Sequence, residues 1–284
     1  MSRVSRARVA ASVERYWADQ IELMRSLPDD LAQRQTDAVH DLRAAGRRLR
    51  ATIRIYRPLL HQKQAVRLLD ELSHYNDVLG RARDAEVATQ HVVEVLDVVP
   101  EGTELAGARD LIDRLRQEQE RTARTAEEMV HSPAATALVD ALAAFCTDPW
   151  RKSVGRGGRG PGRSRILKRV AWAESRAMAV WEQLDGAGLV SPTLAPTRHR
   201  LRRRIKAARY AHESLTDTVK GAAQRAEAFA RASDVLGQMQ DAVVLEGVLA
   251  ADGGEAARTV LAVLRERSEQ AAGRATAIIG EALS

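Results

Sequence analysis

The chain has 284 residues, of which 45% are hydrophobic, 29% are charged and only 4% are aromatic, and its formal net charge is +6. A chain of this length buries a sizeable core, and the abundance of Ala, Leu, Arg and Glu favours helices. The single cysteine, Cys146, excludes an internal disulfide framework and a thiolate metal cluster. The positive charge attracts polyanions without identifying one.

Helical periodicity covers nearly the whole chain, and the alternation typical of strands is absent. The sequence therefore predicts an all-α protein. Its predicted helices span roughly residues 5–26, 36–57, 62–98, 104–131, 134–146, 164–184, 197–217, 220–250 and 254–282. Turns are indicated by "LPDD" at 27–30, "VVPEGT" at 98–103, "DGAGLVSPTLAP" at 185–196 and "ADGGE" at 251–255.

One segment near the middle of the chain, "TDPWRKSVGRGGRGPGRSR" at 147–165, combines Pro, many Gly and six basic residues. We predict that it holds neither helix nor strand and forms a flexible Gly/Arg-rich linker that adds positive charge. It would separate a first half, residues 1–146, from a second half, residues 166–284.

The two halves share two motifs in the same order. "HDLRAAGRRLR" from His40 aligns with "HRLRRRIKAAR" from His199, which gives H-x-L-R-x-x-x-[RK]-x-x-R. "LGRARDAEV" from Leu79 aligns with "LGQMQDAVV" from Leu236, which gives L-G-x-x-x-D-A-x-V. Two matched motifs in matched order indicate a duplicated helical unit, so we expect two pseudo-symmetric helical bundles.

The first motif places its cations on one side of a helix. At about 100° per residue, five side chains fall within a sector of roughly 80°. This first stripe consists of His40, Arg43, Arg47, Arg50 and Arg54. Apolar side chains fall on the opposite side, namely Leu42, Leu49, Ile53 and Tyr56. A solvated charged face is the simplest explanation, but such a face normally interleaves acids with its bases, and this stripe contains none. Arginine also binds phosphate or carboxylate with a planar fork, so the stripe predicts anion binding.

The second motif-bearing helix repeats this arrangement. Its second stripe consists of His199, Arg202, Lys206 and Arg209, with Arg203 beside them. The opposite side carries Leu201, Ile205, Ala208 and Leu215. The first stripe spans roughly 21 Å at about 1.5 Å per residue, which suits a linear polyanion better than one phosphate group. We hypothesise that the two stripes face each other across a groove.

These residues resemble a known family. "VHDLRAAGRRLRATIRIYRPLL" with "LGRARDAE", and "RHRLRRRIKAARY" with "LGQMQD", are similar to the two halves of a CHAD domain, the conserved histidine α-helical domain. The resemblance covers roughly residues 5–284 and implies two four-helix bundles with a basic surface that binds inorganic polyphosphate. It implies that both stripes supply the ligands. The E-x-E-x-[KR] signature of the triphosphate-tunnel domain that many relatives carry is absent, so residues 1–284 resemble a stand-alone CHAD domain.

The remaining motif residues leave alternatives open. Asp84 and Asp241 either hold a stripe arginine in place or form plain interhelical ion pairs. Gly80 and Gly237 permit a close helix contact or a bend, and Gly46 permits the approach of a backbone or a phosphate.

Histidine and aromatic residues carry weaker signals. His40 and His199 either make polyanion affinity rise as pH falls or only orient the start of their helices. The other histidines show no metal-binding spacing. We expect five aromatic residues in the core rather than as stacking platforms, namely Trp17, Trp172, Trp181, Phe145 and Phe229.

The leading interpretation is a polyphosphate-binding protein without catalytic activity, metal or cofactor. The alternative is a helical protein that binds the phosphate backbone of nucleic acid, although the stripes offer little besides Tyr210 for base stacking. An enzyme is disfavoured because the sequence has no P-loop, no acidic cluster for metal ions and no nucleophile with an evident base. The sequence has no window of 18 uncharged apolar residues and no secretory signal, so we expect no membrane span and a cytoplasmic location, with association with polyphosphate granules. The oligomeric state and the preferred chain length are left open.

Overall fold

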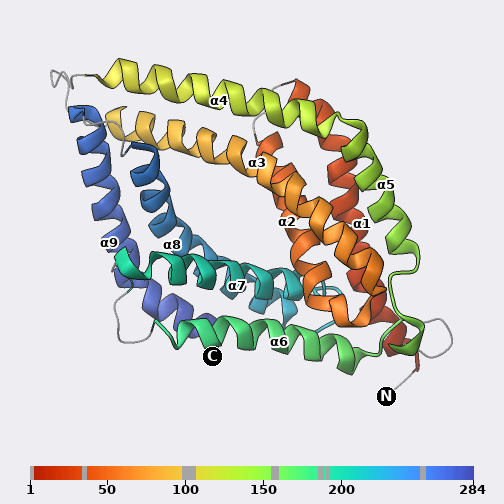
Figure 1. Cartoon of the computed structure of the whole chain (residues 1–284). Helices are drawn as coiled ribbons and strands as arrows, with labels where there is room; N and C mark the ends of the chain where they lie inside the picture. The colour runs from red at the N-terminus through yellow and green to blue at the C-terminus, as the bar shows by residue number, and fades with distance from the viewer. Residues whose placement is uncertain are drawn as a thin grey trace.

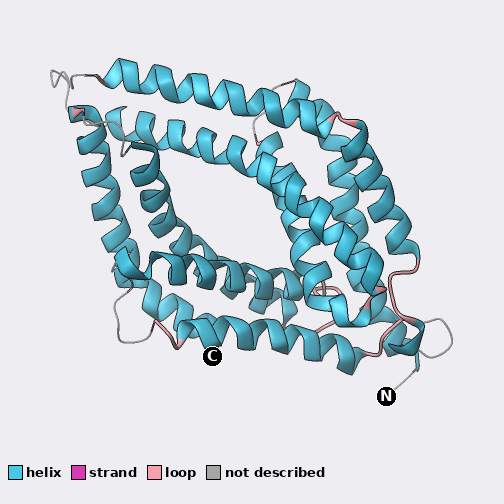
Figure 2. Ribbon diagram, viewed as in Figure 1, coloured by secondary structure: helices cyan, strands magenta, loops and turns pink. Residues whose placement is uncertain are grey.

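The computed structural model describes residues 3–33, 37–97, 107–154, 160–184, 189, 192–249 and 254–284. Within these residues the chain is helical and has no strand (Figure 2), which confirms the predicted all-α fold class. The α-helices are α1 (Arg3–Ala32), α2 (Ala38–Tyr56), α3 (Gln62–Asp97), α4 (Ala108–Val130), α5 (Pro133–Thr147), α6 (Arg163–Trp181), α7 (Ala195–Glu213), α8 (Ala222–Leu249) and α9 (Glu255–Leu283). Short 3₁₀ helices are η1 (Arg57–Leu59), η2 (Lys152–Val154) and η3 (Pro192–Leu194).

The helices form a closed ring with an inner and an outer layer (Figure 1). Helices α2, α3, α8 and α7 lie on the inner side, and each contacts the next, with α7 returning to α2. Helices α4, α5, α6 and α9 lie on the outer side. The four inner helices are those that carry the two repeated motifs, so the duplicated sequences occupy equivalent layers. The division into halves at residues 1–146, 147–165 and 166–284 stays a prediction.

Two apolar cores hold the ring together. The main core runs through both halves and includes Trp17, Leu42 and Tyr56 of the first half and Leu201 and Phe229 of the second. A smaller second core lies where the far ends of α3 and α4 meet α8 and α9. It consists of Ala88, Val92, Val95, Leu111, Leu115, Leu245, Leu249, Ala256, Ala257, Val260 and Leu264. The second core therefore closes the ring on the side opposite to the contact between α2 and α7.

Helix α1 continues through the "LPDD" segment, so the turn predicted at residues 27–30 is wrong. Pro28 lies inside the helix, although an interior proline removes one backbone hydrogen bond. The next turn is kept by Leu31, which is buried against the main core, and by the Gln33 N–H, which donates to the Asp29 carbonyl at 3.1 Å. Burial of an apolar side chain offsets the local penalty that the sequence alone indicates.

The Gly/Arg-rich segment at residues 147–165 holds more structure than predicted. An isolated antiparallel bridge joins Leu60 to Trp150, and α6 begins inside the segment. Trp150 is buried and stacks on Trp17, with ring centroids 5.7 Å apart. The prediction of a flexible tether is wrong for residues 147–154 and 160–165, because the Trp150 ring anchors the segment in the core. Residues 155–159 lie outside the described residues.

None of the described helices is by itself long and apolar enough to cross a membrane. Helices α4 and α5 meet the same requirements of length and composition only as a pair bent by 55°.

Candidate polyanion-binding site

Helix α2 separates apolar from cationic side chains. The four predicted apolar residues are buried, with exposures of 0–1%: Leu42, Leu49, Ile53 and Tyr56. On the other side, Arg43, Arg47 and Arg50 are half-buried, while His40 and Arg54 are exposed at the two ends of the first stripe. Because the apolar side is anchored in the main core, the stripe is presented as one continuous row.

Helix α7 shows the same division. Its apolar side is fully buried through Leu201, Ile205 and Ala208, and Leu215 is buried just beyond the helix. The residues of the second stripe are half-buried, namely Arg202, Lys206 and Arg209, or exposed, namely His199 and Arg203. Each motif therefore starts on an exposed histidine and continues into partly desolvated cations.

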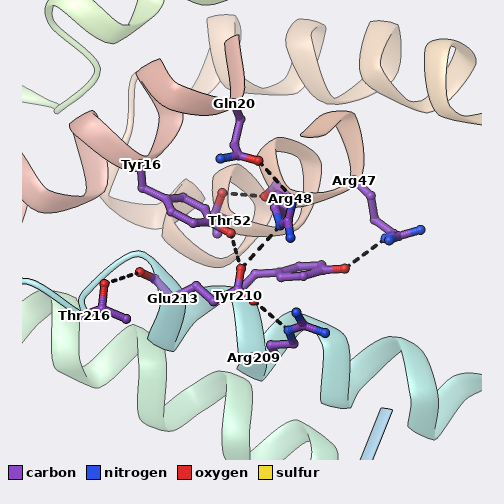
Figure 3. A network of polar contacts seen from close by, with 9 residues as sticks. All are labelled: Tyr16, Gln20, Arg47, Arg48, Thr52, Arg209, Tyr210, Glu213 and Thr216. Carbon is purple, nitrogen blue, oxygen red and sulfur yellow. Dashed lines mark hydrogen bonds and ion pairs between the residues drawn. The ribbon is translucent and has the colours of Figure 1, made fainter. Parts of the chain in front are cut away.

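The two stripes meet where α2 packs against α7. Arg47 Nε donates a hydrogen bond to Tyr210 Oη at 2.9 Å, which joins the first half to the second. The Tyr210 ring lies between Arg48 and Arg209, whose guanidinium carbons are each 5.9 Å from its centroid (Figure 3). Tyr210 is buried, so this sequence neighbour of the second stripe fixes the spacing of the two helices rather than presenting an open ring.

A cavity of about 280 Å³ opens between α2, α6 and α7. Five predicted ligands line it: Arg47, Arg50, Arg54, Arg203 and Lys206. The full lining adds Ala51, Ile55, Trp172, Ala173, Arg176, Arg200, Arg204, Ala207 and Tyr210. Eight lining residues are cationic, and none of the lining residues that the structure describes is acidic. We name this space the cationic cavity. Its positive charge is not balanced by any described lining residue, so the cavity attracts anions from outside the protein.

Arg50 has a donor directed to no protein acceptor. Its Nε is buried and has no hydrogen-bond partner among the described residues. A buried donor without a partner costs about 1–3 kcal/mol. Arg50 also lines the cationic cavity, so this residue combines a cavity-facing charge with an unsatisfied buried donor.

Glu213 neutralises part of the second stripe. Its carboxylate accepts hydrogen bonds from Arg209 Nε at 2.6 Å and from Tyr16 Oη at 2.7 Å, and Arg48 Nε lies 3.4 Å away (Figure 3). Burial and the neighbouring carboxylate raise the pKa of Tyr16, so the phenol stays a donor. Arg209, predicted as a ligand, is thus paired within the α2–α7 contact and does not line the cationic cavity.

Replacing Glu213 by Gln is expected to lower the free energy of unfolding by about 3 kcal/mol, because two guanidinium groups then share a partly buried contact with no countercharge. Thermal unfolding measures the change. Glu227→Gln is the matched control, since Glu227 pairs with Arg231 at 3.3 Å but is 72% exposed, and its loss is expected to cost under about 0.5 kcal/mol. Equal melting temperatures for the two variants would show that the Glu213 contacts stabilise nothing.

Arg43 and Gly46 both contact helix α3. Arg43 Nη2 lies 3.4 Å from Asp84 Oδ1, a long ion pair in which the Asp84 side chain is 56% exposed. The Asp241 side chain lies outside the described residues. A Cβ at Gly46 would lie 3.0 Å from Asn76 Oδ1, so this glycine makes room for a side chain of α3. The expectation of a backbone or a phosphate there is wrong.

The crowded cations lose protons more easily than usual. Burial, followed by the charges of Arg47, Arg202 and Arg43, lowers the pKa of Lys206 to about 6. Because Arg43 and Arg47 belong to the other half, the two stripes share one electrostatic field.

The two stripe histidines respond in the same way. Partial desolvation of the ring and the nearby Arg83 and Arg47 lower the pKa of His40. Partial desolvation and Arg203 lower the pKa of His199, although its hydrogen bond with Gln240 acts in the opposite direction. Both histidines are therefore held in the neutral form by surroundings that an anion would reverse.

The sequence and the fold now identify the family. The model of the CHAD domain family matches residues 15–250. The chain belongs to the CHAD domain family. PptA from Streptomyces chartreusis has a similar structure, with a TM-score of 0.72 and 18% identity over 96% of this chain and 98% of that chain. The CHAD domain from the plant Ricinus communis gives a TM-score of 0.74 and 17% identity over 96% of this chain and 91% of that chain. At these identities the likeness concerns the fold, and no curated protein sequence matches the chain.

This CHAD domain brings further cations to the cavity that the helical pattern did not single out. Arg200 and Arg204 belong to α7, and Arg176 comes from α6. Arg200 and Arg204 stand in the same basic motif as the second stripe, so a wider sector on the helical wheel would have included them. Arg176 could not be found this way, because only the packing of α6 against α7 brings it to the cavity.

Trp172 of the CHAD domain is not a core residue, so this part of the prediction is wrong. The side chain is 36% exposed and lines the cationic cavity, and Arg169 lies over its ring at 4.2 Å from the centroid. Trp17, Phe145 and Phe229 are buried as expected, and Trp181 is partly buried against the main core. Among the described residues no group of three or more His, Cys, Asp or Glu is placed to hold a metal ion.

Proposed function

We propose that this CHAD domain binds inorganic polyphosphate without transforming it, through the cationic faces of α2 and α7 and the cavity between them. The observation that carries the proposal is the cationic cavity, with eight basic and no acidic lining residues among those described. Family membership supports it, because CHAD domains in general bind polyphosphate.

The distribution of charge favours a long chain over a single phosphate group. Arg54, at one end of the first stripe, interacts with Arg50, Arg203 and Arg204. Arg43, three turns away, interacts with Arg47, Arg83 and Arg202. Arg47 and Lys206 connect the two groups, since Lys206 interacts with Arg47, Arg202 and Arg43. A linear polyanion can neutralise both groups at once, whereas one phosphate would neutralise one.

Nucleic acid remains the second candidate because of Trp172. An exposed indole beside arginines is a group on which bases stack. Against this candidate, the other aromatic residue of the cavity, Tyr210, is buried and bonded to Arg47. Polyphosphate has no base to stack, so the two candidates differ in whether they need Trp172.

The absence of catalysis is part of the proposal. The described lining of the cavity consists of Arg, Lys, Ala, Ile, Trp and Tyr, with no carboxylate, serine or cysteine to act as base or nucleophile. A cytoplasmic location and association with polyphosphate granules belong to the same proposal, which imaging of a fluorescent fusion beside a polyphosphate stain would test.

A competition experiment separates the two candidates. Binding to long-chain polyphosphate, single-stranded RNA and duplex DNA is measured at the same near-physiological ionic strength for the wild type and for Trp172→Leu. We expect polyphosphate to bind more tightly than either nucleic acid by at least about tenfold, since it presents the densest row of charges and the site offers few groups for base readout. Trp172→Leu is expected to leave polyphosphate affinity unchanged.

Two results would contradict the proposed function. Nucleic acid that binds as tightly as polyphosphate, with a loss of affinity in Trp172→Leu, would favour the second candidate. Conversion of polyphosphate to shorter chains by the purified protein would overturn the non-catalytic part.

A further inference from the structure

Two glycines of the second motif lie beneath two arginines of the first motif. Gly80 of α3 lies under Arg43 of α2, so that a Cβ built on this glycine would be 3.8 Å from Arg43 Nε and 3.9 Å from Arg43 Nη2. Gly237 of α8 lies under Arg202 of α7, where a Cβ would be 3.2 Å from Arg202 Nη2 and 3.7 Å from its Nε. The first aligned motif pairs Arg43 with Arg202, and the second pairs Gly80 with Gly237. Both halves therefore place an arginine of one inner helix against a glycine of the next.

The second glycine leaves almost no spare room. A separation of 3.8 Å, as at Gly80, is ordinary van der Waals contact, so a methyl group fits there. A separation of 3.2 Å, as at Gly237, is tighter than side chains normally allow, so a methyl group would push the Arg202 guanidinium aside. Neither glycine has a positive φ, so backbone conformation does not explain its presence. At Gly237, space for the Arg202 guanidinium does explain the glycine.

The position of Arg202 matters because its charge belongs to the field that the two stripes share. Its charge acts on Lys206 and His199 of its own helix and on Arg43 of the opposite stripe. A guanidinium held in place before the ligand arrives loses less conformational entropy on binding than a freely rotating one. Moving it would weaken its interaction with the bound anion without removing any charge from the protein.

We propose that Gly237 is a positioning residue for polyanion binding: it leaves the space on α8 in which the Arg202 guanidinium is held facing the ligand. Gly80 lies against Arg43 in the same way, but its looser contact leaves room for a methyl group. The inference rests on the proposed function, since polyphosphate is the anion that the positioned arginines would bind.

Alanine variants of three glycines test the proposal, with long-chain polyphosphate as the probe. Gly237→Ala is expected to weaken binding about threefold to tenfold, the size of a weakened charge-assisted hydrogen bond. Gly80→Ala is expected to change the affinity less than about twofold, because its Cβ fits. Gly247→Ala is the matched control on the same helix, since a Cβ at Gly247 would meet no atom within 4 Å.

A double-mutant cycle then shows whether Gly237 acts through Arg202. In the Arg202→Ala background, Gly237→Ala is expected to have no further effect on affinity, whereas a general disturbance of α8 would reduce affinity in both backgrounds. The proposal is overturned if Gly237→Ala binds like the wild type, or if its effect persists without Arg202.

Failure of the proposed function would be recognised separately. If the wild type does not bind polyphosphate, the proposed function fails. The contact between Gly237 and the Arg202 guanidinium is then tested by thermal unfolding instead. Alanine is more favourable than glycine within a helix, so Gly247→Ala, in the last turn of α8, is expected to raise the melting temperature. Gly237→Ala is expected to show no such gain because its methyl group displaces Arg202, and an equal gain in both variants would overturn the inference.

Discussion

Simultaneous replacement of Arg50, Arg54 and Arg203 by alanine is expected to weaken polyphosphate binding by at least about a hundredfold. Removing one charge-assisted hydrogen bond costs about 1.5–3 kcal/mol, and about 1.4 kcal/mol corresponds to tenfold. The three residues line the cationic cavity from both motif helices. The dependence of affinity on salt should also fall, by roughly 0.7–0.9 in slope for each phosphate that is no longer bound by an arginine. Isothermal titration calorimetry at several salt concentrations measures both effects.

The triple variant should keep its fold, because like charges are removed from a crowded surface. Circular dichroism and thermal unfolding are expected to show unchanged helix content and an equal or higher melting temperature. The matched control removes three exposed arginines from the outer helix α4, Arg109→Ala, Arg116→Ala and Arg124→Ala, for the same change in net charge. If this control loses as much affinity as the cavity variant, binding depends on total charge and the site assignment is wrong.

Lys206→Met is expected to stabilise the free protein while weakening polyphosphate binding at neutral pH and below. Burial and the surrounding arginines lower the pKa of Lys206 from 10.5 to about 6, so this lysine is mostly neutral in the free protein at pH 7–8. A bound polyanion stabilises the charged form, and binding should therefore take up a proton. From about pH 6 upward the affinity is expected to fall, by at most tenfold per pH unit, until the pH exceeds the pKa in the complex.

The stability of the free protein depends on pH in the opposite direction to its affinity for polyphosphate. Between pH 6 and 10.5 the unfolded chain binds the Lys206 proton and the folded protein does not, so stability contributed by this group rises with pH across that window. Lys206→Met removes both the cost of burying this amine among arginines and its contribution to the pH dependence of stability. Thermal unfolding at pH 6 and pH 9 should thus show a smaller difference for Lys206→Met than for the wild type.

Proton uptake separates Lys206 from the histidines. Calorimetry at pH 8 in two buffers of different ionisation enthalpy counts the protons bound with polyphosphate. At this pH the wild type is expected to take up more protons than Lys206→Met, because the variant keeps both histidines and lacks only the Lys206 amine that a bound polyanion would protonate. Equal uptake would show that Lys206 keeps one protonation state throughout.

The cationic helices could be predicted from the sequence because the information is local. A spacing of three and four residues fixes the side of a helix on which His40, Arg43 and Arg47 lie, whatever packs behind it. The same spacing identifies the buried side, and the buried Leu42 and Leu201 agree with it. Most helix bounds followed to within four residues for the same reason. The largest difference is the end of α1, where burial of Leu31 outweighs the signal of Pro28.

The rest of the site depends on contacts between segments far apart in the chain. Trp172 is a large apolar residue of the kind expected in a core. Only the packing of α6 places it on the cationic cavity. Trp150 lies among glycines and arginines whose composition is typical of a tether, yet its ring stacks on Trp17. Gly237 gave the signal of a close approach, but its partner proved to be a guanidinium group, which no helical pattern reveals.

The small second core at the far ends of α3, α4, α8 and α9 has a consequence for how the protein folds. Its residues come from segments on either side of the whole α5–α7 region, so their contacts have a large sequence separation. The contacts across the α2–α7 joint span as many residues, but the second core consists of only eleven buried aliphatic side chains and therefore offsets less of the loop-closure entropy than the main core does. We therefore expect the amide protons around the second core to exchange before those at the α2–α7 contact, which is backed by the larger main core.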